Sequence, residues 1–393
     1  MADCCIIGGG VIGLSLAREL AGRGAAVELV CRDPVERTAS WAAAGIFPPL
    51  ADGPAATALE RFTAFSDRLH WQWADELRAE TGIDNGLRRC GGLHVAGTRA
   101  GRERLAAARA RWLAARVRCI DCDGTAVAAA EPALGGAVAR GTVSAGVILP
   151  DEAQIRPSRH LDALLASCRA RGVRITTATV QGLELDGRRV GGVRTDGGTV
   201  RAERYCLAAG SWSEGLAAAL GLALPTRPIR GQIVLVRLPR QLLSRIVSFG
   251  LDYLVPRPDG RLLVGATIED VGFDDRTTAA GEAGLIDVAR RLLGDVDGAV
   301  VERSWSGLRP GNRDGRPTLG PVPGWDNVWV TTGHFRAGMH LSTGSAVAVA
   351  DMLDGAVPAP WLDAFAPWRD TECDDESVDA YLARVEAAAV SPP

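Results

Sequence analysis

The first 31 residues alternate between hydrophobic runs and glycine-rich turns in the order strand, turn, helix, strand. The apolar run "DCCII" precedes "GGG", apolar residues at 11, 12, 14, 16, 17 and 20 lie on one helical face, and "AAVELV" is a second apolar run. Gly22 and Gly24 end the helix between these runs. Strands that alternate with helices in this way are typical of a parallel sheet covered by helices. The pattern therefore predicts half of a doubly wound α/β fold.

Beyond this unit the pattern changes several times between helical and strand-like segments. Helical periodicity runs from about 55 to 80, short strands and one helix near 100–115 follow, and a strand-helix-strand unit with a hairpin occupies 145–213. Strand-like segments cover 227–308, and a last strand and helix lie between 327 and 355. We therefore predict two domains between which the chain crosses, with these limits: 1–85, 150–225 and 310–367 for the first, 86–149 and 226–309 for the second, and 368–393 for a C-terminal tail. The tail is acidic and then helical, and we expect its end to fray.

Composition and charge narrow the classes of function. The 393 residues carry a net charge of -3, with a pI near 6.0, which offers no electrostatic field to nucleic acid or an anionic membrane and indicates a small partner. All 44 basic residues are arginine, so a lysine Schiff base to pyridoxal phosphate and a phosphate loop ending in Gly-Lys-Ser/Thr are both excluded. The sequence contains no apolar run long enough to span a membrane.

The cysteine and histidine positions do not predict a metal site. The nine cysteines are an odd number, Cys119 and Cys122 form a single CxxC pair, and the five histidines show neither HxxxH nor HExxH spacing. A structural zinc or a thiol redox centre is therefore not expected. An apolar strand is expected from Ala2 without a charged segment before it, so we expect no signal peptide and a cytoplasmic protein.

The glycines after the first strand have the spacing of a dinucleotide-binding turn. Gly8, Gly10 and Gly13 follow GxGxxG, which permits a tight turn, close approach of a pyrophosphate, and close packing of helix on strand. An ordinary glycine turn is the alternative, but the surrounding strand-helix-strand unit favours dinucleotide binding. At the end of the second strand, where an acidic residue usually holds the ribose hydroxyls, the chain has Cys31, with Asp33 two residues further on.

Three further segments carry a family resemblance. They are "TASWAAAGIFPPL" at 38–50, "DYLVPRPDGRLLVGATIEDVGFDDRTTAAG" at 252–281, and "SWSGLRPGNRDGRPTLGP" with "TTGHFRAGMHLSTG" near the end. Together with "GGGVIGLSLA" they resemble the FAD-dependent amino-acid oxidase family that includes D-amino-acid oxidase and sarcosine oxidase, over nearly the whole chain from Asp3 to about Leu353. Within that family they are most similar to the glycine oxidase branch of thiamine biosynthesis, for which "GATIEDVGFD" and "GHFR" are specific.

The resemblance implies a two-domain flavoprotein. The first set of segments would form a discontinuous, doubly wound FAD-binding domain of the Rossmann type, similar to that of glutathione reductase. The second set would form a substrate domain on a mixed antiparallel sheet. The FAD is expected to be non-covalent, because no cysteine lies between Cys206 and Cys373 to form a thioether near "RPGNRDG".

The resemblance also implies the residues of the site. Arg309 of "GLRP" would bind the substrate carboxylate, and Tyr253 of "DYLVP" and Arg336 of "GHFR" would complete the substrate pocket. The residues implied to contact FAD are Gly8, Gly10, Val11, Ile12, Gly13, Cys31, Arg32, Ser40, Ala44, Gly45, Ile46, Val180, Gly210, His334, Phe335, Arg336, Ala337, Gly338, Met339 and His340.

Elementary chemistry supports some of these roles. A guanidinium is the two-pronged donor that holds a carboxylate in one orientation, although a salt-bridged scaffold arginine is the alternative for Arg309. The small residues "AAAG" at 42–45 suit a backbone pressed against a flavin ring, or simply a close helix contact. For His334 we favour a positioning role over a general base, because a neutral amine can give hydride to a flavin without one. His340 has no better case than an ordinary helix residue.

The expected function is FAD-dependent oxidation of glycine, with sarcosine and small D-amino acids as further candidates, to imine or glyoxylate, ammonia and hydrogen peroxide. The expected partners are a small amino acid and molecular oxygen, with no nucleic acid and no membrane. A homo-oligomer and a thiazole synthase as pathway partner stay open. The alternatives are a related amino-acid dehydrogenase or N-methyl amino-acid oxidase, or a flavin-binding subunit without turnover of its own. Departures from the family pattern at Ala337, Ile46 and Ile268 remove one polar side chain and reshape a small pocket.

Overall fold

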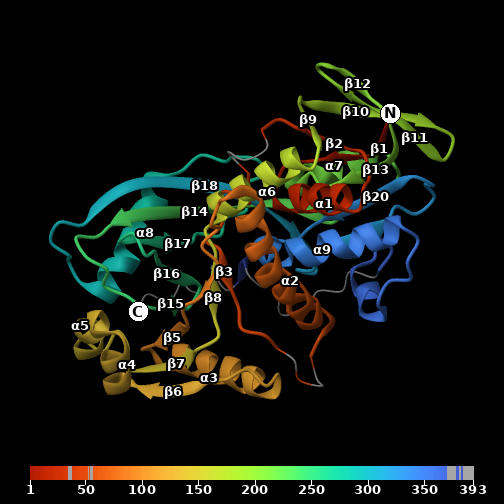
Figure 1. Cartoon of the computed structure of the whole chain (residues 1–393). Coiled ribbons are helices and arrows are strands. Elements are labelled where there is room, and N and C mark those ends of the chain that lie inside the picture. Colours follow the sequence, from red (N-terminus) through yellow and green to blue (C-terminus); the bar gives the residue numbers. More distant parts are fainter. Residues whose placement is uncertain (34–37, 52, 54–55, 370–377, 380–381, 384–393) are drawn as a thin grey trace.

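Two large β-sheets and the helices that cover them make up the fold (Figure 1). The computed structural model describes residues 1–33, 38–51, 53, 56–369, 378–379 and 382–383. One large sheet has six strands and the other has eight. The expectation of a helical tail with a frayed end falls mostly outside the described residues.

The six-stranded sheet carries the glycine turn at its centre. Its strands, in spatial order, are β19 (Thr318–Pro321), β20 (Val328–Thr332), β13 (Ala202–Leu207), β1 (Ala2–Ile7), β2 (Val27–Cys31) and β9 (Arg174–Thr177). All neighbours pair in parallel except β19 with β20, which is antiparallel. The continuous apolar sequences of β1 and β2 are those of strands that are buried on both faces, as a parallel sheet between layers requires.

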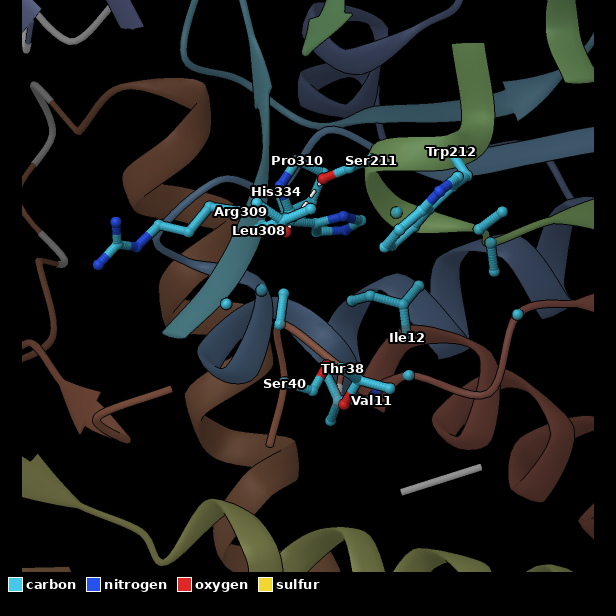
Figure 2. A pocket seen from close by; sticks show the side chains of 18 of the residues that line it. Val11, Ile12, Thr38, Ser40, Ser211, Trp212, Leu308, Arg309, Pro310 and His334 are labelled. Atoms are coloured by element: carbon cyan, nitrogen blue, oxygen red, sulfur yellow. Dashed lines mark hydrogen bonds between the residues drawn. The ribbon is translucent and has the colours of Figure 1, made fainter. Parts of the chain in front are cut away.

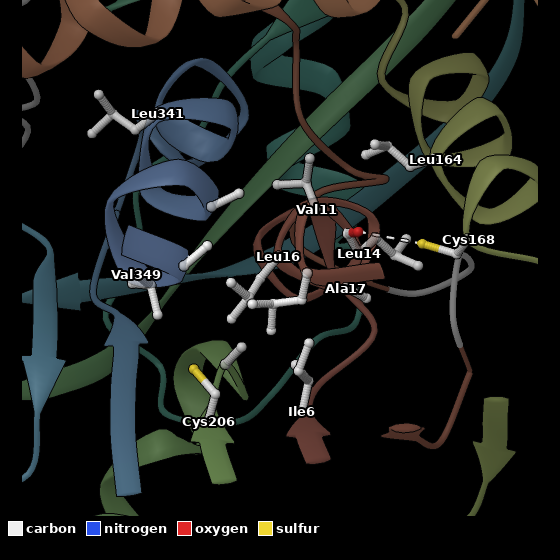
Figure 3. Close-up of a cluster of buried hydrophobic side chains, with 14 of the residues drawn as sticks. Ile6, Val11, Leu14, Leu16, Ala17, Leu164, Cys168, Cys206, Leu341 and Val349 are labelled. Atoms are coloured by element: carbon white, nitrogen blue, oxygen red, sulfur yellow. Dashed lines mark hydrogen bonds between the residues drawn. The ribbon is translucent and has the colours of Figure 1, made fainter. Parts of the chain in front are cut away.

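Helices form a tightly packed layer on this sheet. They are α1 (Val11–Gly22), α2 (Ala58–Thr81), α6 (Pro157–Ala170) and α9 (Gly338–Leu353). Figure 3 shows α1 between α6 and α9, with Leu16, Leu164 and Val349 turned into one core. Leu16 and Leu164 are fully buried, and each such leucine stabilises the fold by about 2 kcal/mol. This core holds the start of α1, and with it the glycine turn, in a fixed place.

The eight-stranded sheet and its helices form the second part of the fold. Its strands, in spatial order, are β18 (Val300–Asn312), β14 (Thr226–Arg237), β17 (Arg261–Gly265), β16 (Asp252–Pro256), β15 (Ile246–Phe249), β5 (Gly92–Ala96), β7 (Ala145–Leu149) and β6 (Ile120–Asp123). Neighbours are antiparallel except β15 with β5. The helices of this part are α3 (Arg99–Ala114), α4 (Gly124–Ala130), α5 (Gly135–Ala139) and α8 (Ala279–Leu293). A separate hydrophobic core includes Leu93, Val234, Leu254 and Leu292.

Two small sheets and several short helices complete the described elements. They are β10 (Val180–Asp186), β11 (Arg189–Thr195) and β12 (Gly198–Val200) in one sheet, β3 (Ile46–Phe47), β8 (Ala153–Gln154) and β4 (Arg88–Arg89) in the other, helix α7 (Ser213–Ala218), and the 3-10 helices η1 (Pro132–Leu134), η2 (Gly210–Trp212) and η3 (Pro360–Phe365). The hairpin expected after the second strand-helix-strand unit corresponds to β10 and β11.

This architecture confirms the expected fold class, a doubly wound α/β part combined with a mixed, mostly antiparallel sheet. The six-stranded sheet draws on residues 2–31, 174–207 and 318–332, and the eight-stranded sheet on 92–149 and 226–312. The predicted domain limits stay an interpretation of this arrangement. Within the described ranges, no helix has the length and apolar character needed to cross a membrane.

Candidate active site

A pocket of about 910 Å³ is lined by residues from both large sheets. Figure 2 shows Val11, Ile12 and Ser40 on one side of it and Arg309 and His334 on the opposite side. We call Gly8, Gly10, Val11, Ile12 and Ser40 the cofactor wall, and Gly231, Tyr253 and Arg309 the substrate wall. A cavity of this volume at the carboxyl ends of parallel strands is a common position for a ligand site.

The cofactor wall is built around the turn between β1 and α1. Gly8 has a φ of +122°, and a Cβ on Gly8 would lie closer than 3.0 Å to the carbonyl oxygen of Ala208. A Cβ on Gly13 would lie equally close to the carbonyl oxygen of Gly8. Gly10 is the N-cap of α1 and supplies no side-chain cap, while the backbone N–H of Val11 donates to Ser40 Oγ at 3.0 Å. The positive end of the α1 dipole therefore faces the pocket, which fits the pyrophosphate of a dinucleotide.

The end of β2 presents an unusual set of groups to the pocket. Burial raises the pKa of the Cys31 thiol to about 11, so this thiol is neutral and a weak hydrogen-bond acceptor. Arg32 places its guanidinium 4.4 Å from the ring centroid of Trp212, and both side chains line the pocket together with Asp33. Asp33 and the ring of Trp212 thus line the pocket beside Cys31, the position that is usually acidic in a dinucleotide-binding fold.

The small residues of the loop at 38–46 allow it to press against β18. A Cβ on Gly307 of β18 would lie closer than 3.0 Å to the Cβ of Ala42, and Trp305 Nε1 donates to the carbonyl oxygen of Ala42 at 3.3 Å. Gly45 has a φ of +72° and leaves no room for a side chain beside the carbonyl oxygen of Ile155. These contacts explain the "AAAG" run and keep its backbone at the pocket surface.

Arg309 reaches the substrate wall from β18. Its guanidinium lies flat on Gly231 of β14, where a Cβ would come closer than 3.0 Å to both terminal nitrogens. Its Nη1 donates to the carbonyl oxygens of Thr267 at 3.1 Å and Arg230 at 3.3 Å. Burial lowers the pKa of this guanidinium below its ordinary value, but it stays far above neutrality. Arg309 is therefore a half-buried, oriented cation at the pocket surface.

Tyr253 of β16 lies beside Arg309. Its ring fills the space above Gly265, where a Cβ would come closer than 3.0 Å to the ring atoms. Burial raises the pKa of the phenol, against the opposing charges of Arg309 and Arg336. The hydroxyl is therefore a neutral hydrogen-bond donor at physiological pH. Arg336 is exposed and also lines the pocket.

His334 lines the pocket as a neutral ring. Burial lowers its pKa to about 3, and Nε2 lies 2.9 Å from Ser345 Oγ. The next residue, Phe335, has a φ of +47°, and its N–H donates to the carbonyl oxygen of Pro310 at 2.9 Å. A residue other than glycine in this region of φ needs support from its surroundings. The segment after β20 is thus fixed by its backbone contacts with β18.

Most of the residues expected in the site come together in this pocket. Those in its wall are Gly8, Gly10, Val11, Ile12, Cys31, Arg32, Ser40, Ala44, Gly45, Ile46, Val180, Gly210, Tyr253, Arg309, His334, Phe335, Arg336, Gly338 and Met339. The structure does not place Gly13, Ala337 or His340 in that wall. Gly13 packs on the turn itself, and Ala337 packs against the core of the helical layer.

His340 points into the helical layer instead of the pocket. Its ring stacks on Phe47 with the centroids 4.3 Å apart, and its Nε2 lies 3.4 Å from Asp67 Oδ1. Position 340 falls on the side of α9 that faces α2, because α9 turns by about 100° per residue from its start at Gly338. The structure therefore favours the alternative that His340 is an ordinary helix residue.

The sequence analysis missed several residues of the pocket wall. They include Trp212, Gly231 and Gly307. Gly231 and Gly307 are directly paired between β14 and β18. A glycine inside a strand pattern is a sign of close approach by another group, and both strands carried that sign.

The comparison with known families identifies the kind of pocket. The family described as FAD dependent oxidoreductase (DAO) matches residues 3–352. The chain belongs to this family. The glycine turn, the uncapped start of α1 and the pocket volume fit the FAD that the family binds, so the expected cofactor is confirmed. That the FAD is non-covalent stays a prediction.

Similar proteins narrow the class of enzyme further. The glycine oxidase of Pseudomonas aeruginosa is 37% identical over 359 residues, which cover 90% of this chain and 95% of that protein. The bifunctional protein ThiO/ThiG of Nostoc sp. is 34% identical over 375 residues, which cover 92% of this chain and 54% of that protein. The crystal structure of glycine oxidase from Geobacillus kaustophilus matches with a TM-score of 0.88 at 31% identity, over 94% of this chain and 99% of that chain. These findings confirm a FAD-dependent amino-acid oxidase.

Proposed function

We propose that this oxidase acts on glycine and produces glyoxylate, ammonia and hydrogen peroxide. Sarcosine and small D-amino acids are proposed as weaker substrates. The observation that carries the proposal is the half-buried guanidinium of Arg309 beside the Tyr253 hydroxyl, in the wall of the pocket that fits FAD. The names of the relatives, which are glycine oxidases, support the choice of substrate.

Arg309 and Tyr253 would hold the substrate by its carboxylate. Nη1 of Arg309 donates to two backbone carbonyls, so the carboxylate would bind on the Nη2 side of the fork, next to the Tyr253 hydroxyl that pairs with the same guanidinium. The Tyr253 hydroxyl adds one directed donor. Because two guanidinium groups, Arg309 and Arg336, line the pocket, they lower the pKa of a bound ammonium group and favour the neutral amine that the reaction needs.

The proposed reaction removes two hydrogens from the substrate. The residues of the cofactor wall would hold FAD, which would supply the hydride acceptor, and oxygen would be the final acceptor of the two electrons, giving hydrogen peroxide. The Cα–H bond would break with its electron pair, and the amine proton would pass to water, so that the two hydrogens end in hydrogen peroxide. The resulting imine would take up water to give glyoxylate and ammonia. His334, neutral and hydrogen-bonded to Ser345, has a positioning role in this proposal and is not the base that accepts the amine proton.

The pocket wall limits the size of the substrate side chain. Ile46, Ile233 and Tyr253 bring branched or aromatic groups to the pocket, and Ala44 and Ile46 pack against the cluster that contains Tyr253. An amino acid without a side chain, or with one methyl group, suits this surface best. The proposal therefore ranks glycine and sarcosine above larger D-amino acids.

The proposed function is tested by anaerobic mixing of the FAD-loaded protein with glycine, sarcosine or D-alanine, followed by air. Glycine should bleach the flavin absorbance, and air should restore it with peroxide as product. Arg309→Lys should raise the KM for glycine about 100-fold, equivalent to about 2.7 kcal/mol, because a lysine cannot form the two-pronged bond. Arg290→Lys, on the exposed side of α8, is the control. Failure of all three amines to bleach the flavin would refute the proposal, and bleaching without peroxide would indicate a dehydrogenase.

We further propose that the product supplies thiazole synthesis for thiamine. Support comes from relatives in which a ThiO part is joined to ThiG in one protein. The measurement is growth without thiamine of a bacterial strain that lacks its own glycine oxidase and carries this chain. If a strain with the Arg309→Lys variant grew at the same rate, growth would not depend on the oxidase activity. That result would refute the proposed link to thiamine synthesis.

A further inference from the structure

The segment "GATIEDVGFD", on which the resemblance depends, folds back over β14 next to Arg309. It follows β17, and its backbone pairs with that of β14 through Arg230 and Glu269, whose N–H groups donate to each other's carbonyl oxygens at 2.8 and 3.0 Å. Neither Arg230 nor Glu269 lines the pocket, and the proposed reaction assigns no role to either. Their contacts nevertheless lead directly to the guanidinium of Arg309.

The Glu269 carboxylate, whose side chain is 25% exposed, is the centre of a partly buried polar network. It forms an ion pair with Arg230 Nη2, and its Oε1 accepts from Gln232 Nε2 at 2.7 Å and from Thr267 Oγ1 at 2.5 Å. The Thr267 hydroxyl also accepts from the backbone N–H of Gln232 at 2.8 Å. We call Arg230, Gln232, Thr267 and Glu269 the carboxylate bracket. Such a network restricts the motion of its members, because none of them can turn without losing a partly buried hydrogen bond.

Charge and hydrogen bonds stabilise the contacts of the carboxylate bracket. Burial alone would raise the pKa of Glu269, but the hydrogen bonds from Arg230, Thr267 and Gln232 lower it below its ordinary value. Glu269 is therefore ionised at neutral pH. The Arg230 side chain is 5% exposed and is further held by Asp274 Oδ2 at 3.2 Å and the carbonyl oxygen of Arg276 at 3.1 Å. Both terminal nitrogens of this buried arginine are therefore paired within the protein, which keeps them from competing with Arg309 for an anion.

The bracket fixes the two carbonyl oxygens to which Arg309 donates. These oxygens belong to Arg230 and Thr267, two of the four bracket residues, and lie 3.3 and 3.1 Å from Arg309 Nη1. Gly231, between Arg230 and Gln232, supplies the flat surface under the guanidinium. The orientation of the Arg309 fork is therefore set by backbone atoms whose positions depend on the Glu269 carboxylate.

We infer that Glu269 and Thr267 are positioning residues for substrate binding, which act by orienting Arg309 toward the carboxylate of the substrate. The inference rests on the proposed role of Arg309. It predicts that loss of the bracket weakens carboxylate binding while FAD stays bound, because a two-pronged bond depends steeply on the angle of the guanidinium plane.

The test measures binding of acetate, a carboxylate without an amine, to the FAD-loaded protein by its perturbation of the flavin spectrum. Glu269→Gln should weaken acetate binding and raise the KM for glycine by about 10-fold, with kcat changed by less than about 3-fold. Glu131→Gln is the matched control, since Glu131 is a buried carboxylate in the same part of the molecule that binds Ser244 and Arg245, far in sequence from the bracket. Its acetate affinity should equal that of the unmodified protein.

A second variant keeps the test decisive if Glu269→Gln fails to fold. Thr267→Val preserves the shape of the side chain and removes only the hydroxyl that joins Glu269 to the backbone of Gln232. It should weaken acetate binding about 3-fold to 5-fold. In an Arg309→Lys background, Thr267→Val should have no further effect, because both changes act through the same guanidinium.

The possible results separate the inference from the proposed function. Unchanged acetate affinity in both bracket variants, alongside a large loss in Arg309→Lys, would overturn the inference and leave the role of Arg309 intact. Additive losses in the double variant would also overturn it. Unchanged acetate affinity in Arg309→Lys itself would instead refute the proposed role of Arg309 in substrate binding, and the inference with it.

Discussion

The two walls of the pocket differ in whether backbone atoms or side chains form their surface. The cofactor wall presents mostly backbone, from the turn of Gly8 to Ile12 at the start of α1. The substrate wall presents the side chains of Arg309 and Tyr253, which lie on strands. Both walls depend on glycine, but for different reasons. In the first, glycine lets backbone approach backbone, and in the second it makes room for the end of a side chain.

This difference predicts how each wall responds to an added methyl group. A backbone carbonyl inside a packed turn cannot move without displacing its strand, whereas a guanidinium can swing away on its flexible stem. A change in the cofactor wall should therefore cost fold and FAD together. A change in the substrate wall should cost only the affinity for substrate.

Gly13→Ala should have the largest effect. The new Cβ would lie closer than 3.0 Å to the carbonyl oxygen of Gly8, so α1 must move away from β1, at a cost of about 3 kcal/mol. The displaced turn should also lose the pyrophosphate site. We expect a protein with little bound FAD after purification and a lower midpoint in urea unfolding. Gly284→Ala in α8 is the control, since a Cβ there meets nothing within 4 Å. Full FAD content in Gly13→Ala would contradict the importance of backbone approach.

Gly231→Ala should have a smaller and more selective effect. Its Cβ would displace the terminal nitrogens of Arg309, so the KM for glycine should rise about 30-fold, equivalent to about 2 kcal/mol. FAD content should stay full, and the free energy of unfolding should change by less than about 1 kcal/mol. Absorbance at the flavin maximum, steady-state kinetics and urea unfolding measure the three quantities, again with Gly284→Ala beside them. Loss of FAD in this variant would show that the two walls are not independent.

The same difference explains what the sequence could predict. The cofactor wall is local, because Gly8, Gly10 and the start of α1 lie within one run of residues, and their spacing alone specifies the turn. The bracket around Glu269 joins Arg230 to a residue 39 positions away, and only strand pairing brings them together. The resemblance predicted Arg309 and Tyr253, yet neither resemblance nor spacing indicated which glycines lie beneath them.

His340 shows a further limit of sequence reasoning. The residues from His334 to His340 were all expected to contact FAD. The first part of this segment is irregular and follows the pocket, but α9 begins at Gly338, and from there the side chains turn in a helical period. Met339 still reaches the pocket wall, while His340 packs on Phe47. A helix boundary that falls inside a motif therefore divides its residues between site and core.

The pH dependence of stability also separates the two parts of the molecule. Burial lowers the pKa of His160 in α6 and His334 after β20 to about 3, so both are neutral when folded. The unfolded chain binds protons at these residues below about pH 6.5, so their contribution to stability is lost as the pH falls from there toward 3. Asp252 of β16, in the eight-stranded sheet, acts in the opposite direction.

Asp252→Asn should have the smallest effect, with a distinct pH signature. Burial raises the pKa of Asp252 to about 6, against the opposing charge of Arg291. The folded protein therefore keeps a proton that the unfolded chain has lost above about pH 4, and stability falls as the pH rises from about 4 to 6. Asparagine removes this cost, so we expect a gain of about 1 kcal/mol at pH 7.5, after allowance for partial exposure, and about a third of that gain at pH 4.5.

Urea unfolding at pH 4.5, 6.0 and 7.5 measures this gain. Asp295→Asn is the control, because its carboxylate is 90% exposed and pairs only loosely with Arg290, at 3.4 Å. Its unfolding free energy should follow that of the unmodified protein at all three pH values. An equal gain for Asp252→Asn at every pH would mean that the carboxylate is not the source of the effect. A gain found mainly at high pH would show that the ionised carboxylate of Asp252 destabilises the eight-stranded sheet. The buried histidines, in contrast, are neutral in the folded protein.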